Sequence, residues 1–163
     1  MLPARSPYSL IQEDLWPDEW MILVSCMMLN CTSRKQVEKV LPLFMQNWPN
    51  ASSLIVCNPD DLKKVIKPLG FANRRSAALI KMSLAYLKGE WSHAQELPGI
   101  GEYAARAWEM FCCNVTGYDP PVDHALVKYY HWRRKNEEII GQEKRQGEDP
   151  TTQEGEVGHQ QAS

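Results

Sequence analysis

The chain has 163 residues, of which 44% are hydrophobic and 23% charged, and its formal net charge is −2. These values favour one compact domain and exclude collagen-like, low-complexity and wholly disordered proteins. The longest apolar run, residues 21–29, is interrupted by Ser25 and falls short of the roughly 18 to 20 residues of a membrane helix. We therefore expect no membrane span and, since residues 1–8 show no signal-peptide pattern, a reducing compartment.

The charges are unevenly distributed along the chain. Residues 142–163 contain two basic and five acidic residues, so the part before them is close to neutral. A near-neutral body produces no global field that identifies a nucleic-acid ligand, and such a ligand must be argued from specific residues. The same segment contains only Val157 and Ala162 as hydrophobic residues, which predicts a domain of residues 1–141 and a disordered polar tail of residues 142–163.

Helical periodicity dominates the first 141 residues. Residues 20–30 are apolar nearly all round, as in a helix buried at the centre of a bundle. The next helix has Ser33 as its N-cap, and Pro42 is expected to kink or split it. Its apolar face follows helical spacing through Val37, Val40, Leu41, Phe44, Met45 and Trp48.

Start and stop signals predict two further helices. Asn58 followed by Pro59 begins a short helix that Gly70 ends. A longer helix is predicted over 73–87, and its apolar side consists of Ala77, Ile80, Leu84 and Leu87. Alternating strand patterns are almost absent, because residues 53–57 are too few to count against so many helices. The fold class is therefore all-α, a compact helical bundle.

A glycine-containing turn follows at residues 97–101, between a polar segment and a renewed helical run over 102–113. Gly99 and Gly101 can adopt positive φ and approach another surface closely, while Ile100 can insert into the core. Backbone amides of such a turn point outward and suit a DNA phosphate. Taken alone, this pattern is more often structural.

Downstream of Leu97-Pro98-Gly99-Ile100-Gly101 comes the sequence Pro120-Pro121-Val122-Asp123-His124. With these two motifs at this spacing the chain resembles the helix-hairpin-helix DNA glycosylase superfamily. Over residues 5–135 it is similar to the thymine glycosylases that carry a methyl-CpG-binding domain. The residues behind this closer resemblance are 6–8, 10–12, Trp20, Leu29, Asn30, Thr32, Ser33, 67–70, Lys128, Tyr129, His131 and Trp132. The resemblance implies an active-site cleft between two helical subdomains and DNA contacts from the hairpin residues Leu97, Gly99, Ile100 and Gly101.

Asp123 is the candidate catalytic carboxylate. Cleavage of an N-glycosidic bond develops positive charge on the sugar, and a carboxylate beneath the ring stabilises that charge and activates a water. An aspartate immediately before a helix also makes an ordinary N-cap, and this second interpretation stays open.

Tyr103 is the second candidate catalytic residue. The resemblance places it where some superfamily members have a lysine that forms a Schiff base with the sugar, and tyrosine cannot form that imine. It implies that Tyr103 lines the pocket of an extruded base, although a half-buried helix aromatic is the plain structural alternative.

The resemblance also implies two loops that fill the gap left by an extruded base. The first contributes Asn30, Cys31, Thr32 and Arg34, and it has Cys31 where the related glycosylases have a longer arginine. The second contributes Leu69, Gly70 and Phe71, an apolar wedge. Ala125 replaces a lysine of the family. Further candidates for phosphate contacts, each of which also suits a solvated helix face, are Lys35, Arg74, Arg75, Arg106, Lys128, Arg133 and Arg134.

No cofactor or metal is predicted. The five cysteines, Cys26, Cys31, Cys57, Cys112 and Cys113, lack Cys-x-x-Cys spacing, so neither a disulfide framework nor a zinc site is expected. No cysteine follows Cys113, whereas superfamily members with an iron–sulfur cluster use four cysteines after the aspartate. The resemblance does allow a monovalent cation on hairpin backbone carbonyls.

These features predict a monofunctional glycosylase that removes thymine or uracil opposite guanine and leaves an abasic site. Its partner would be double-stranded DNA with a mismatched or deaminated base, bound by a monomer in the nucleus, or in the cytoplasm if the source is not eukaryotic. Two alternatives remain: an adenine-type mismatch glycosylase without an iron–sulfur cluster, and a catalytically inactive DNA-binding module, which Cys31 and Ala125 favour.

Overall fold

A computed structural model describes residues 5–113 and 123–147 of the chain. Within these ranges all regular elements are helical and none is a strand, which confirms the predicted all-α class. The α-helices are α1 (Ile11–Leu15), α2 (Glu19–Leu29), α3 (Arg34–Asn47), α4 (Ala51–Ile55), α5 (Pro59–Ile66), α6 (Ala72–Lys88), α7 (Glu102–Phe111) and α8 (His124–Gly147), and two 3-10 turns are η1 (Lys67–Leu69) and η2 (Ala94–Glu96).

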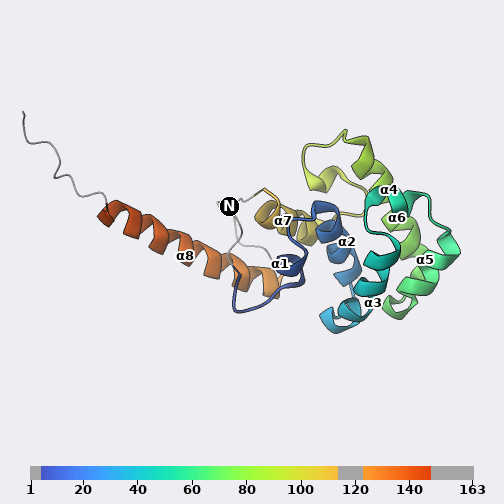
Figure 1. Cartoon of the computed structure of the whole chain (residues 1–163), viewed down its shortest axis with the longest axis horizontal. Helices are drawn as coiled ribbons and strands as arrows, with labels where there is room; N and C mark the ends of the chain where they lie inside the picture. The colour runs from blue at the N-terminus through green and yellow to red at the C-terminus, as the bar shows by residue number, and fades with distance from the viewer. Residues whose placement is uncertain (1–4, 114–122, 148–163) are drawn as a thin grey trace, which may run out of the picture.

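Helix α2 is the central element of the bundle. In Figure 1 it lies between α3, α4, α5 and α6 on one side and α1, α7 and the start of α8 on the other. Its residues 20–26 and Met28 are all buried, as predicted for a segment that is apolar nearly all round. The two helical groups on either side of α2 therefore share one core.

Helix α3 begins as predicted, with a capping box between Ser33 and Gln36. Pro42 does not split the helix, which continues to Asn47. Pro42 lies on the exposed face, where its missing backbone N–H costs one hydrogen bond while the opposite face stays packed in the core. That face is the predicted one, except that Met45 is 36% exposed.

Helix α6 covers the predicted segment, but its buried face is different. The residues turned inward are Ser76, Leu79, Met82 and Ser83, whereas Leu84 and Leu87 are exposed. The reason is a buried polar contact: the indole N–H of Trp20 on α2 donates to Ser83 Oγ over 3.0 Å. This bond satisfies the indole inside the core, so Ser83 faces inward while Leu84 beside it is exposed.

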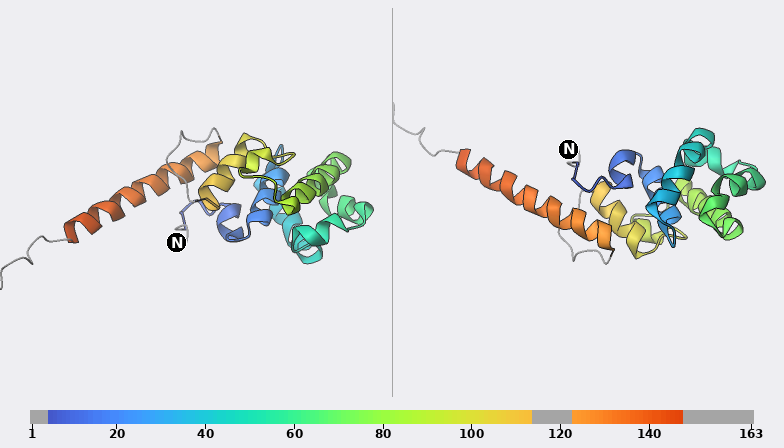
Figure 2. Two further views of the ribbon diagram at one scale, coloured as in Figure 1. Left: turned by 90° about the horizontal axis from the view of Figure 1, so that it is seen from above. Right: turned by 90° about the horizontal axis from the view of Figure 1, so that it is seen from below.

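Helix α8 packs by its first turns and then leaves the body. Leu126, Tyr129, Tyr130 and Arg133 are buried, and the Tyr129 ring lies 4.8 Å from that of Phe111 on α7. Figures 1 and 2 show the rest of α8 extending away from the other helices. The predicted domain boundary at residue 141 falls inside this helix, so 142–147 are helical, and the remainder of the predicted tail lies outside the described residues. None of the described helices is long and apolar enough to span a membrane.

Candidate active-site cleft

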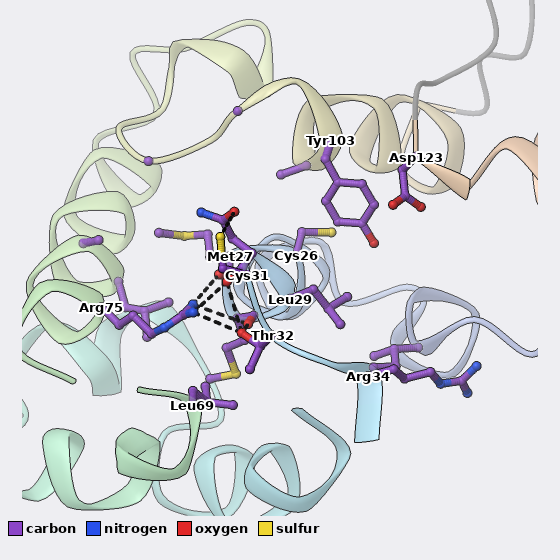
Figure 3. A pocket seen from close by; sticks show the side chains of 18 of the residues that line it. Cys26, Met27, Leu29, Cys31, Thr32, Arg34, Leu69, Arg75, Tyr103 and Asp123 are labelled. Carbon is purple, nitrogen blue, oxygen red and sulfur yellow. Dashed lines mark hydrogen bonds between the residues drawn. The ribbon is translucent and has the colours of Figure 1, made fainter. Parts of the chain in front are cut away.

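A cleft of about 860 Å³ opens beside the C-terminal end of α2. One wall comes from η1 and the start of α6, and the other from the hairpin, the start of α7 and the residues that begin α8. Figure 3 shows Tyr103 and Asp123 on one side and Arg75 and Leu69 on the other. The predicted site residues that line the cleft are Asn30, Cys31, Thr32, Arg34, Leu69, Phe71, Gly99, Gly101, Tyr103 and Asp123.

Asp123 both caps a helix and lines the cleft. Its Oδ2 accepts hydrogen bonds from the backbone N–H groups of Ala125 at 3.0 Å and Leu126 at 3.1 Å. Its Oδ1 has no hydrogen-bond partner among the residues that the structure describes. The cap therefore fixes the carboxylate at the start of α8 and leaves one oxygen for the cleft.

Tyr103 reaches the cleft from the first turn of α7. Its hydroxyl accepts a hydrogen bond of 2.9 Å from the side-chain amide of Gln12. Burial, together with the neighbouring Cys26 and Asp123, raises the pKa of Tyr103 above its ordinary value. The phenol stays protonated, and its O–H remains available as a hydrogen-bond donor.

Gln12 and Cys26 join the cleft without having been predicted as site residues. Gln12 is only 2% exposed, and its amide nitrogen also donates to Cys26 Sγ over 3.4 Å. Burial raises the pKa of Cys26 to about 11, so its thiol is neutral. The sequence indicated Gln12 only as part of a segment that resembles the glycosylases. The five residues of α1 are too few to show helical periodicity.

The hairpin forms as predicted around one left-handed glycine. Gly99 has φ +80°, and a Cβ there would lie 2.9 Å from Met27 Cε on α2. Gly101 does not need positive φ: its backbone is extended, and it serves as the N-cap of α7 without a side-chain capping bond. The first N–H groups of α7 are therefore left without a side-chain partner at the rim of the cleft.

Not every predicted DNA-contact residue lines the cleft. Leu97 and Ile100 are 2% and 6% exposed. They anchor the hairpin in the core, which was the predicted position of Ile100. Gly70 is exposed but lies outside the cleft lining.

The predicted wedge at residues 69–71 is reduced to one protruding side chain. Leu69 is 5% exposed and packs into the core, whereas Phe71 is 70% exposed. Cys31 in the other predicted loop is also exposed. Both Phe71 and Cys31 adopt positive φ, at +51° and +57°, a conformation that non-glycine residues rarely hold.

The candidate phosphate contacts differ in their position. Arg34, Arg74 and Arg75 line the cleft, and Arg34 pairs with Glu38 at 2.7 Å. Arg133 is buried, donates to the carbonyl of Met110 and pairs with Glu137. Arg133 is therefore part of the contact between α7 and α8 and is not a surface cation that could contact a phosphate.

Comparisons with known proteins identify the family of the chain. The profile of the HhH-GPD superfamily of base excision DNA repair proteins matches residues 24–148. A methyl-CpG-binding domain protein 4-like protein of Arabidopsis thaliana is 37% identical over 133 residues, which cover 82% of this chain and 30% of that protein. A thymine-DNA glycosylase of Aeropyrum pernix is 27% identical over 119 residues, covering 68% and 52%.

A solved structure shares the fold. The structure of a thermostable thymine-DNA glycosylase superposes with a TM-score of 0.58 at 19% identity, over 69% of this chain and 53% of that one. The chain spans about half the length, or less, of the curated relatives that it matches.

Proposed function

Because the chain belongs to the HhH-GPD superfamily of base excision DNA repair proteins, we propose that it is a DNA glycosylase acting on thymine or uracil opposite guanine. It would hydrolyse the N-glycosidic bond and leave an abasic site. The observation that carries this proposal is the shared cleft. It is lined by Asp123, a carboxylate with one oxygen unpartnered among the described residues, and by Tyr103, a protonated phenol.

Asp123 supplies the chemistry in this proposal. As the bond between the sugar and the base breaks, the base leaves with the bonding electrons and the sugar becomes positively charged. The negative carboxylate stabilises this charge, and its free Oδ1 accepts a proton from the water that adds to the sugar. The helix cap on Oδ2 fixes the direction of the group.

Tyr103 and Gln12 are proposed to hold the extruded base. A ring that borders the cleft can stack on a base, and the phenol and the side-chain amide offer hydrogen bonds to its edge. Tyr103 has no amine, so we propose that strand cleavage through a Schiff base does not occur.

We propose that the protein binds duplex DNA as a monomer, through the remaining elements of the cleft. The hairpin at Gly99 and the uncapped start of α7 suit a phosphate. Phe71 and the loop around Asn30, which line the cleft, are proposed to fill the gap that the base leaves. We propose that the reaction requires no cofactor and that the hairpin backbone carbonyls can hold a monovalent cation. In a eukaryote the enzyme would act in the nucleus.

The test is a strand-cleavage assay. A labelled duplex with a single G·T or G·U mismatch is incubated with the protein, and one half of each sample is treated with hot alkali. Cleavage at the mismatch only after alkali is the expected result. Cleavage without alkali contradicts the monofunctional assignment, and cleavage of an A·G duplex alone supports the adenine-type alternative. Duplex binding without cleavage of any of these or of single-stranded uracil DNA indicates a binding module.

A further inference from the structure

Arg75, in the first turn of α6, bonds groups outside that helix through its whole guanidinium. Its guanidinium donates to four backbone carbonyls and one hydroxyl, namely Gly70 O (3.0 Å), Met27 O (3.2 Å), Met28 O (3.4 Å), Asn30 O (2.6 Å) and Thr32 Oγ1 (3.0 Å). A guanidinium has five N–H groups, so none is left for a DNA phosphate. Arg75 therefore acts through the protein.

The acceptors belong to two separate loops. One is the 30–32 loop together with the end of α2, and the other is the 69–71 loop, which precedes α6. Figure 3 shows the guanidinium of Arg75 bonded to the first of these. The two loops are far apart in the sequence, and the Arg75 side chain bonds both.

Each loop contains one strained residue beside an Arg75 bond. Asn30 and Thr32, both acceptors, flank Cys31 with its φ of +57°, and the acceptor Gly70 directly precedes Phe71 with its φ of +51°. Such strain persists only where surrounding contacts hold it, and it gathers at functional sites. Cys31 and Phe71 also both line the cleft.

We propose that Arg75 is a positioning residue that locks the 30–32 and 69–71 loops into one rigid unit, so that both enter the duplex together when a base is extracted. This inference rests on the proposed function. Independent loops would have to be ordered at the moment of extraction, whereas the locked pair is already in place. The planar fork is needed, because the ammonium of a lysine carries three donors instead of five.

The first experiment measures amide hydrogen exchange by NMR in Arg75→Ala and Arg75→Lys. The amides of Thr32 and Gly70 bond inside their own loops, to Leu29 O at 3.3 Å and Lys67 O at 3.0 Å. We expect the amides of Thr32 and Gly70 to exchange faster, by a similar factor, in each of the two Arg75 variants. Lys81→Ala, which removes an exposed charge from the same helix, is the control and should change neither. Faster exchange in only one loop, or in none, overturns the coupling.

The second experiment compares excision of uracil from a G·U duplex and from single-stranded DNA, which has no stack to open. In Arg75→Lys the ratio of duplex to single-strand rates should fall about tenfold or more, whereas Lys81→Ala keeps it. An unchanged ratio, or an equal loss on both substrates, contradicts the role in extraction. If the unaltered protein excises neither, the proposed glycosylase function fails, and the exchange measurement still decides whether Arg75 couples the loops.

Discussion

Asp123 illustrates how one side chain serves both the fold and the chemistry. Oδ2 closes the first turn of α8, Asp123 lines the cleft, and Oδ1 has no hydrogen-bond partner in the described part of the chain. The two sequence interpretations of Asp123, helix cap and catalytic carboxylate, are therefore compatible. Substitutions at this one position can separate them.

We predict that Asp123→Asn loses excision by about a hundredfold or more while it keeps duplex binding and stability. Asparagine caps helices as well as aspartate does, so the fold is preserved, but the amide carries no negative charge. The measurement is single-turnover excision beside a binding titration. Asp123→Ala is the matched control, because it loses the cap as well and should be destabilised by about 1 kcal/mol. Full excision by Asp123→Asn would rule out the catalytic role.

Cys31 permits a gain-of-function prediction. It is exposed in the cleft, at the position where the family resemblance of the sequence implies a longer arginine. Cys31→Arg should raise excision from duplex DNA relative to single-stranded DNA, because a longer side chain fills more of the gap left by the base. Cys57→Arg, outside the cleft, is the control. Equal rates for Cys31→Arg and the unaltered protein would show that another residue fills the gap.

At the scale of elements, α6 is oriented by a polar contact that its apolar pattern does not reveal. The pattern 77, 80, 84 and 87 predicted the wrong face, since Ser83 is buried against Trp20 and Leu84 is 47% exposed. Ser83 therefore packs in the core, whereas Leu84 beside it does not.

We predict that Ser83→Ala lowers the free energy of unfolding by about 1 to 3 kcal/mol, because it leaves the buried Trp20 N–H unpaired. Leu84→Ala, at an exposed position, should change it by no more than about 0.5 kcal/mol. Urea unfolding of the two variants at one pH measures both. The opposite order would mean that the leucine side of α6 faces the core.

The sequence predicted those elements whose ends carry local signals. Ser33 is the N-cap of α3 as expected, and Asn58 followed by Pro59 begins α5 as expected, because these contacts form between near neighbours. Helix α1 and its residue Gln12 were missed, since five residues carry no periodicity and Gln12 meets Tyr103 only after the chain folds. The contacts of Arg75 depend likewise on two distant loops.

At the scale of the whole molecule, buried thiols and phenols favour the protonated state of the folded protein. Burial raises the pKa of Cys26 from 9.0 to about 11, that of Cys112 from 9.0 to about 12, and that of Tyr129 from 10.0 to about 12. The unfolded chain releases these protons at lower pH than the folded one. Stability due to these groups is therefore complete below about pH 9 and is lost as the pH rises towards the folded-state values.

We predict that the urea midpoint falls steadily from pH 8.5 to pH 10.5 at constant ionic strength. Tyr129→Phe should weaken this fall, because Tyr129 is fully buried and burial is the main cause of its raised pKa. A midpoint that stays constant over this range would contradict the prediction.

The candidate site was predicted in part from residues that stand far apart in the chain. The hairpin and Asp123 were recognised as two motifs at a fixed spacing, and the fold brings Tyr103, Asp123 and the 30–32 loop to one cleft. The burial of individual side chains could not be predicted: Leu69 and Arg133 are buried, and Phe71 is exposed. Side-chain exposure is decided by contacts between elements, which a linear pattern does not contain.

Helix α8 starts at the cleft with Asp123 and ends at Gly147 away from the other helices (Figure 2). The end of α8 is therefore a suitable site for attaching a label. A dye, an affinity tag or a surface tether joined near Gly147 would lie at the end of α8 that is turned away from the other helices. Single molecules could be immobilised by that part of α8.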